Sequence, residues 1–131
     1  FIATGADDEA VAEKIAWVRQ RVAFYGSTRA YWPVLEQHGL EDLGLKLHEM
    51  VKAGKWQEMA DEISDDVLAL FAVVGRHDGL AGKVAERFAG LSDAIYASTA
   101  PDVVFDMPPG LIADIQRIPA GFREFGDGGE G

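Results

Sequence analysis

The stretch FIATGADDEAVAEKIAWVRQRV, residues 1–22, predicts a short strand followed directly by a helix. Its first five residues form an apolar run closed by Gly5, which is typical of a buried strand or of its last residues. Asp7 is expected to cap the helix, because Asp8 and Glu9 then lie at the positive end of the helix dipole. Apolar residues recur at helical spacing through Val11, Ile15, Val18 and Val22. We expect this helix to end at residues 22–24.

The chain from Gly26 to Ser64 reads as a series of helices separated by glycines. Gly26 should break the first helix, and Ser27 or Thr28 can cap a short one that has Pro33 in its first turn and ends at Gly39. The apolar spacing of residues 40–53 predicts another helix, which Gly54 stops. Two more helical starts are expected, near Trp56 and after a Ser64 cap.

The second half of the chain mixes helix and strand signals. Residues 67–71 favour a helix, whereas residues 72–74 are ambiguous and fit a strand-like connector before Gly75. A helix is predicted within residues 78–91 and a strand within residues 92–98, followed by a loop over residues 99–110 and a weak helix over residues 111–117. The order of strand, helices and strand indicates an α/β domain spanning residues 1–126, with residues 127–131 as a flexible tail.

Composition excludes several classes of partner. The 131 residues include 22 acidic and 12 basic side chains, so the formal net charge is −10, and the basic residues are scattered. This pattern argues against nucleic acid and anionic membranes as partners. No apolar run approaches the roughly 20 residues that span a bilayer, and no signal peptide is recognisable, so we expect a cytoplasmic protein. The chain has no cysteine, which excludes disulfides and thiolate chemistry.

Local motifs for metals and nucleotides are incomplete. HEMVK, residues 48–52, begins like a zincin helix but has Lys52 where the second histidine ligand must stand. GRHDGLAGK, residues 75–83, imitates a phosphate loop without its first Gly or its final Ser or Thr. The acidic pairs fall at expected helix starts, where capping explains them. We therefore expect no metal site and assign no catalytic residue.

The least generic segment is VAFYGSTRAYWPVLEQHG, residues 22–39, which places aromatic side chains around a Gly-Ser-Thr step. One interpretation is packing between two helices, with Ser27 or Thr28 as a cap. The other is that Tyr25, Gly26, Ser27 and Thr28 supply aromatic walls and hydroxyl groups to a ligand cleft. The residues alone leave both open.

Several ordered blocks of the chain resemble the C-terminal part of luciferase-like monooxygenases, most of all the branch that uses the deazaflavin coenzyme F-420. The blocks are FIATGADDE, IAWVRQRVAFYGSTRAYWPVLEQHG, GKWQEMADEISDDVLALFAVVG and VAERFAGLSDAIY, which together cover about residues 1–98. The chain departs from the family at VGRHDG, residues 74–79, where members often have Val-Gly-Thr-Pro followed by two acids. The proline at the helix start and an acid that complements the helix dipole are missing there.

The resemblance implies that this chain is the C-terminal fragment of a (β/α)8 barrel, predominantly helical with two short strands. Residues 1–4 would lie in a late strand and residues 94–97 in the final one, so most strands of a barrel of roughly 250 residues are absent. Ligands of such barrels bind at the carboxyl ends of the strands. The resemblance therefore suggests a cofactor or substrate pocket at Thr4, Gly5, Tyr25, Gly26, Ser27, Thr28 and Ser98.

The function implied is that of a flavin- or deazaflavin-dependent oxidoreductase, by hydride transfer or monooxygenation of a small organic substrate. Coenzyme F-420 or FMN would bind the parent protein, whereas the fragment alone is expected to be inactive and to bind neither tightly. Exposed apolar surface would be covered in a homo-oligomer or by another association. The alternatives are an autonomous helical protein-interaction domain and a small-ligand carrier that uses the aromatic loop.

Overall fold

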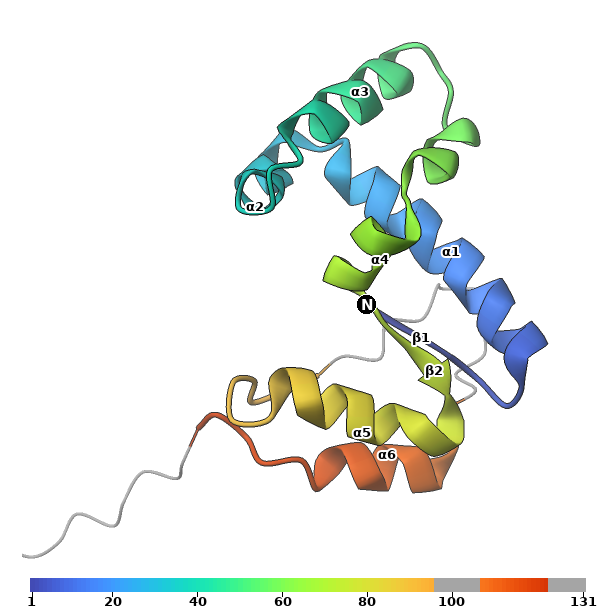
Figure 1. Ribbon diagram of the computed structural model, residues 1–131, viewed down its shortest axis with the longest axis vertical. Coiled ribbons are helices and arrows are strands. Elements are labelled where there is room, and N and C mark those ends of the chain that lie inside the picture. The colour runs from blue at the N-terminus through green and yellow to red at the C-terminus, as the bar shows by residue number, and fades with distance from the viewer. Residues whose placement is uncertain (96–106, 123–131) are drawn as a thin grey trace, which may run out of the picture. The chain divides into compact units, whose positions relative to one another are not determined.

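The computed structural model describes residues 1–95 and 107–122 (Figure 1). The chain divides into two units, one formed by Phe1–Val11 together with the described residues from Val73 onward, and the other by Ala12–Ala72. We call them the strand unit and the helical unit. The elements follow the order β1 Ile2–Gly5, α1 Asp8–Gly26, 3₁₀ helix η1 Arg29–Tyr31, α2 Trp32–Glu36, α3 Glu41–Lys52, 3₁₀ helix η2 Glu58–Glu62, α4 Asp65–Phe71, β2 Val73–Arg76, α5 His77–Phe88 and α6 Pro109–Gln116.

The strand unit contains a parallel pair, β1 and β2, in which Ile2 is opposite Val73 and Gly5 is opposite Arg76. The predicted first strand is therefore confirmed, and the ambiguous segment at residues 72–74 leads into a strand. Parallel neighbours need a long crossover between them. Here the crossover consists of α1 and the rest of the helical unit, which ends with α4. The described residues are thus mixed α/β, mostly helical with two short parallel strands.

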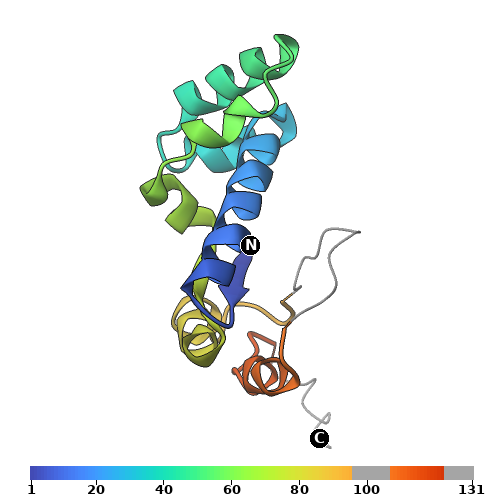
Figure 2. The same cartoon turned by 90° about the vertical axis from the view of Figure 1, so that its right-hand side faces the viewer.

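Helices α5 and α6 complete the strand unit and lie side by side (Figures 1 and 2). Their buried contact with β2 is formed by Val73, Leu80, Val84 and Leu111. Helix α5 follows β2 without a loop, whereas the sequence predicted a start near residue 78. Helix α6 begins two residues earlier than predicted, because Pro109 fits the first turn of a helix, where its missing N–H is not needed.

The strand predicted within residues 92–98 is absent from the part of that segment that the structure describes, residues 92–95. Ala94 and Ile95 belong to no strand, and the remainder of that segment lies outside the described residues, as do residues 99–106 of the predicted loop and the tail at residues 127–131. The second strand of the described chain is β2 instead. The strand within residues 92–98 was predicted from an apolar centre with one β-branched residue. That signal was too weak, because strand propensity depends on cross-strand neighbours.

Local capping explains the helices of the helical unit. Asp7 Oδ1 accepts a hydrogen bond from the backbone N–H of Ala10 at 2.9 Å, which confirms the predicted cap of α1. Ser64 Oγ accepts from Val67 N–H at 3.3 Å at the start of α4, also as predicted. Gly39 and Gly54 have φ of 66° and 72° after α2 and α3, a backbone conformation that favours glycine.

Two helical predictions need correction. The helix expected near Trp56 is only the short 3₁₀ helix η2, and the short helix expected after Thr28 is split into η1 and α2. Thr28 precedes η1 but makes no side-chain cap there. Its hydroxyl is used by the preceding helix instead, since it donates to the carbonyl oxygen of Phe24.

Buried apolar side chains of the helical unit come from α1, α2, α3, η2, α4 and the segment between η2 and α4. The largest of those that are fully buried are Val18, Leu47, Met59 and Ile63. Arg19 fastens α1 to the segment after η2, because its guanidinium donates to the carbonyl oxygen of Ile63 and forms a 2.6 Å ion pair with Asp65. Both η2 and α4 lie along the same side of α1 (Figure 2).

Candidate functional site

The carboxyl ends of β1 and β2 meet at one edge of the strand unit. Thr4 is opposite Gly75 in the register, and His77 begins the helix that follows β2. Thr4 is only 5% exposed, and its Oγ1 lies 3.0 Å from Nδ1 of the half-buried His77. Either group of this pair can donate the hydrogen bond, since a hydroxyl and a neutral imidazole can each act as donor or as acceptor.

Thr4 holds one nitrogen of the His77 ring and leaves the other available. Within residues 1–95 and 107–122, Nε2 of His77 has no hydrogen-bond partner. The second nitrogen of a histidine is donor or acceptor according to the bond that the first one makes. The pair can therefore orient a hydrogen bond, or a proton, toward a molecule bound at this edge.

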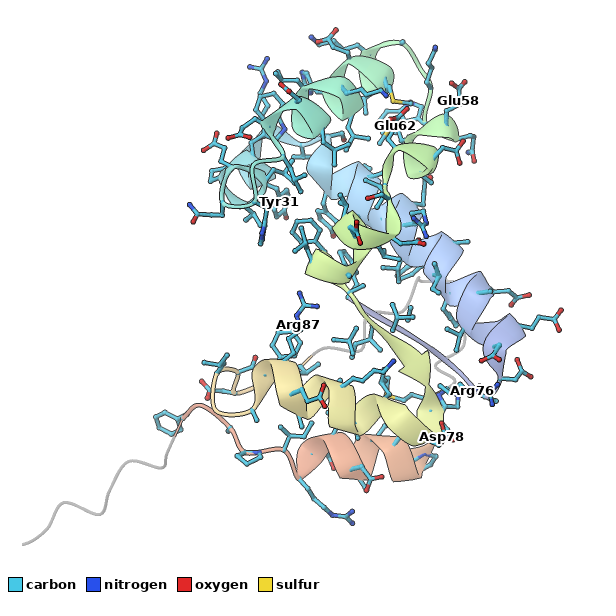
Figure 3. The ribbon with its side chains drawn as sticks, viewed as in Figure 1. Tyr31, Glu58, Glu62, Arg76, Asp78 and Arg87 are labelled. Atoms are coloured by element: carbon cyan, nitrogen blue, oxygen red, sulfur yellow. The ribbon has the colours of Figure 1, made fainter. Side chains whose placement is uncertain are left out.

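An ion pair between Arg76 and Asp8 lies at the same edge, beside His77. Arg76 donates from Nε and Nη2 to the two carboxylate oxygens of Asp8, at 2.6 Å each. The hydrogen bonds and the positive charge of Arg76 hold the pKa of Asp8 below its ordinary range, and Asp8 in turn raises the pKa of Arg76. Arg76 lies at the junction of β2 and α5, next to Asp78 in the first turn of α5 (Figure 3). Asp78 therefore places an acid in the first turn of α5, where the family resemblance had suggested that such an acid was missing.

Two glycines at this edge leave room for neighbouring groups, Gly5 for the start of α1 and Gly75 for the side chain of Lys83. A Cβ at Gly5 would lie 2.6 Å from Cβ of Ala10 and 2.7 Å from the backbone nitrogen of Val11, so no side chain fits between β1 and the start of α1. At Gly75 the aliphatic part of Lys83 covers the strand, while Lys83 Nζ donates to the carbonyl oxygen of Val74 at 2.7 Å. Gly5 is therefore a backbone position of the edge and has no chemistry of its own.

The aromatic loop belongs to the helical unit, and its hydroxyl groups are already engaged. Ser27 Oγ and Thr28 Oγ1 both donate to the carbonyl oxygen of Phe24, at 2.6 and 3.3 Å. Each hydroxyl has one proton to donate, so in this state both can only accept from a further molecule. Ser27 is 6% exposed. These contacts end α1 at Gly26 and fit the packing interpretation of the loop.

The remaining groups of the loop also pack locally. The carbonyl oxygen of Gly26 accepts from Trp32 Nε1 at 3.1 Å, and a Cβ at Gly26 would lie 2.9 Å from Leu47. The Tyr25 ring stands edge-on to Tyr31, with 5.0 Å between centroids. Trp32 in turn stands edge-on to His48.

The seven site residues expected from the sequence fall into three groups. Thr4 and Gly5 lie at the strand edge, Tyr25 to Thr28 lie in the helical unit, and Ser98 lies outside the described residues. Sequence reasoning missed His77 and Arg76, which it had treated as part of a failed phosphate loop. The available signal was their position directly after residues 72–75, since side chains that follow parallel strands gather at one edge.

The described residues contain neither a candidate metal site nor a candidate membrane-spanning helix. No group of three or more histidine and acidic side chains is placed to hold a metal ion among residues 1–95 and 107–122. In the same ranges, no helix has both the length and the apolar character needed to cross a membrane.

Comparison of the sequence with known proteins identifies the family to which the chain belongs. Residues 1–94 match the sequence pattern of the family described as luciferase-like monooxygenase. Uncharacterised proteins of Mycobacterium bovis and of two strains of Mycobacterium tuberculosis are each 47% identical over 95 residues, which is 72% of this chain and 28% of the relative. The chain thus spans less than a third of the curated relatives that it matches. No solved structure matches it significantly.

Proposed function

Because the chain belongs to the luciferase-like monooxygenase family, we propose that it is the C-terminal segment of a flavin- or deazaflavin-dependent oxidoreductase. Membership of the family implies oxidoreductase chemistry in general. The finer proposal is that the complete enzyme uses coenzyme F-420, or else FMN, to transfer a hydride to, or to oxygenate, a small organic substrate. The bound coenzyme supplies the redox chemistry, and the protein holds and orients the reactants.

The observation that best supports this proposal is the parallel pairing of β1 with β2 and the polar groups at its carboxyl end. Ligands of open α/β sheets and of barrels bind at the carboxyl ends of parallel strands. Thr4 and His77 are polar side chains held at that end, with Arg76 and Asp8 beside them. Their chemistry fits hydrogen bonding to the carbonyl, ring nitrogen or hydroxyl groups of a flavin-type coenzyme.

The described residues provide only part of such a pocket. Parallel sheets are normally covered on both faces and contain more than two strands. The described chain has two strands of four residues each, and the matched segment is 28% of each relative. We therefore propose that polypeptide beyond this segment completes the barrel and the coenzyme pocket.

The candidate residues then take different roles. Thr4 and His77 would contact the bound molecule, and Gly5 would let β1 approach α1 closely enough to shape the edge. Tyr25, Gly26, Ser27, Thr28 and Ser98 remain proposed pocket residues. For Ser27 and Thr28 the proposal is limited to accepting hydrogen bonds, since both donate to Phe24.

A titration tests the division of the pocket. The 131-residue chain is titrated with coenzyme F-420 and, separately, with FMN, and fluorescence is followed. We expect no saturable binding in the micromolar range to either. Micromolar affinity would contradict the proposal, because it would show that the pocket is complete within these residues.

A further inference from the structure

Thr4 is a buried side chain with one hydroxyl proton to place. The residue is 5% exposed, and among residues 1–95 and 107–122 its Oγ1 has Nδ1 of His77 as its sole hydrogen-bond partner. A buried donor that finds no acceptor carries the full cost of its lost hydration. The direction of this single hydrogen bond therefore decides whether the Thr4 proton is satisfied.

The two possible directions of the bond leave different groups unsatisfied. If Nδ1 of His77 carries the ring proton and donates to Oγ1, the Thr4 proton has no acceptor in the described part of the chain. If Thr4 donates to Nδ1 instead, its proton is satisfied, and the proton of the neutral ring lies on Nε2. Acceptors with unused lone pairs are tolerated in protein interiors more often than unpaired donors. Burial of Thr4 thus favours the second direction.

The Nε2 side of the His77 ring is the side that another molecule can reach. His77 is half-buried, and none of the described residues forms a hydrogen bond with its Nε2. The ring is held at the end of β2, because Thr4 lies opposite Gly75 in the register. His77 also falls within residues 74–79, where the chain departs from the family pattern. Membership of the family therefore does not predict this pair.

We propose, in an inference that rests on the proposed function, that Thr4 is a positioning residue whose hydroxyl fixes His77 as an Nε2–H donor toward the bound coenzyme or substrate. The group that faces His77 is then a hydrogen-bond acceptor, either a carbonyl oxygen or an unprotonated ring nitrogen. In this tautomer Nε2 has no free lone pair, so it cannot take up a proton as a general base. Its role is to stabilise negative charge on the acceptor.

His48 provides an internal comparison within the same chain. Its Nδ1 lies 3.1 Å from the carbonyl oxygen of Ser27. A carbonyl oxygen can only accept, so Nδ1 of the neutral His48 ring carries the proton and Nε2 does not. His48 and His77 are both half-buried, and their neutral rings are therefore expected in opposite tautomers.

The test is NMR of the ring nitrogens in this chain at about pH 9, where a histidine of ordinary pKa is neutral. The resonance of each ring nitrogen shows whether it carries the proton. We expect the proton on Nε2 of His77 and on Nδ1 of His48 in the same sample. The Thr4 hydroxyl proton should exchange slowly with water and show a nuclear Overhauser effect to the His77 ring, because it is buried and bonded.

Two substitutions at Thr4 separate positioning from packing. Thr4→Ser keeps the hydroxyl and loses a methyl group, whereas Thr4→Val keeps the shape and loses the hydroxyl. The Nδ1 resonance of His77 should stay that of a hydrogen-bonded acceptor in Thr4→Ser and move to that of an unbonded acceptor in Thr4→Val. A purely structural role of Thr4 would leave this resonance unchanged in both variants. His48 should respond to neither, and circular dichroism checks that both variants are folded.

The class of ligand is tested in a full-length chimera, in which this chain replaces the matching segment of the 47% identical mycobacterial relative. The probes are coenzyme F-420 and FMN. His77→Leu removes the donor and should weaken coenzyme binding about tenfold, the size of one net hydrogen bond. His77→Gln places an amide N–H near the position of Nε2, so it should lose less affinity than His77→Leu.

The two experiments separate failure of this inference from failure of the proposed function. A chimera that binds neither coenzyme would contradict the proposed function, whereas the tautomer of His77 is read from the chain without any coenzyme. A proton on Nδ1 of His77, or an exchanging mixture of both tautomers, would overturn the inference. So would equal Nδ1 resonances in Thr4→Ser and Thr4→Val, or a chimera whose coenzyme affinity is unchanged by His77→Leu.

Discussion

Thr4 and His77, separated by 73 positions in the sequence, are joined by a 3.0 Å contact between Oγ1 and Nδ1 at the carboxyl ends of two parallel strands. Neither residue lies in a motif that could be read locally. The contact exists because β1 and β2 pair in a register that places Thr4 opposite Gly75, two residues before His77.

The first prediction concerns this contact. Thr4→Val keeps the shape of the side chain but removes its hydroxyl, so Nδ1 of His77 loses its partner. The free energy of unfolding should fall by about 1 kcal/mol, the usual net contribution of one hydrogen bond. Urea denaturation of Thr4→Val, His77→Ala and the double variant measures the coupling between the two residues, which we expect to be about 0.5–1.5 kcal/mol. Additive single effects would show that the contact contributes nothing.

The second prediction concerns the Asp8–Arg76 ion pair. Arg76 holds the pKa of Asp8 below its ordinary value of 3.8, so the contribution of this carboxylate to stability is fully present above that value. It is lost as the pH falls through the lower pKa of the folded state. Arg76→Gln should raise the pKa of Asp8 toward its ordinary value, measured by NMR titration of the side-chain carbon. An Asp8 titration unchanged by Arg76→Gln would exclude the pair in solution.

The third prediction tests the close approach of β1 and α1. Gly5→Ala would place a methyl group 2.6 Å from Cβ of Ala10 and against the helix backbone, which cannot move aside cheaply. We expect a loss of about 1–3 kcal/mol in the free energy of unfolding, as for other overpacked sites. Gly82→Ala is the matched control, because nothing lies within 4 Å of its new Cβ and α5 should gain up to about 1 kcal/mol. Equal effects of the two variants would contradict the close approach.

The fourth prediction separates packing from ligand contact in the aromatic loop. Ser27→Ala removes the donor to the Phe24 carbonyl oxygen from a nearly buried position, so it should lower the free energy of unfolding by about 1 kcal/mol. Thr28→Ala should cost less, since its bond is longer and exposed. Thermal unfolding of both variants checks the order. If Ser27→Ala left stability unchanged, its hydroxyl would be free to serve a ligand as a donor.

Local signals were sufficient to predict most helices. The caps at Asp7 and Ser64 and the glycines at 39 and 54 act within a few residues, so the sequence indicates where α1, α3 and α4 begin or end. The corrections arise where local signals compete. Thr28 was expected to start a helix, and it ends one instead, because its hydroxyl reaches back to Phe24.

Long-range pairing was what the sequence could not supply. Residues 72–74 are short and apolar, a pattern shared by a buried strand and by the end of a helix. Only the pairing with Ile2 to Gly5, about 70 residues earlier, makes the segment from Val73 a strand. Thr4 could therefore be predicted as a strand-end residue, whereas Arg76 and His77 became visible only when the second strand was in place.

The central claim is that this segment supplies one side of a coenzyme pocket in a luciferase-like oxidoreductase. Its most direct test is a chimera, in which this chain replaces the matching segment of the 47% identical mycobacterial relative. The relative is first titrated with coenzyme F-420 and FMN to establish which one it binds. We predict that the folded chimera binds the same coenzyme with an affinity within about tenfold of the relative, a difference of about 1.4 kcal/mol. A folded chimera that binds neither coenzyme, beside a relative that binds one, would contradict the account.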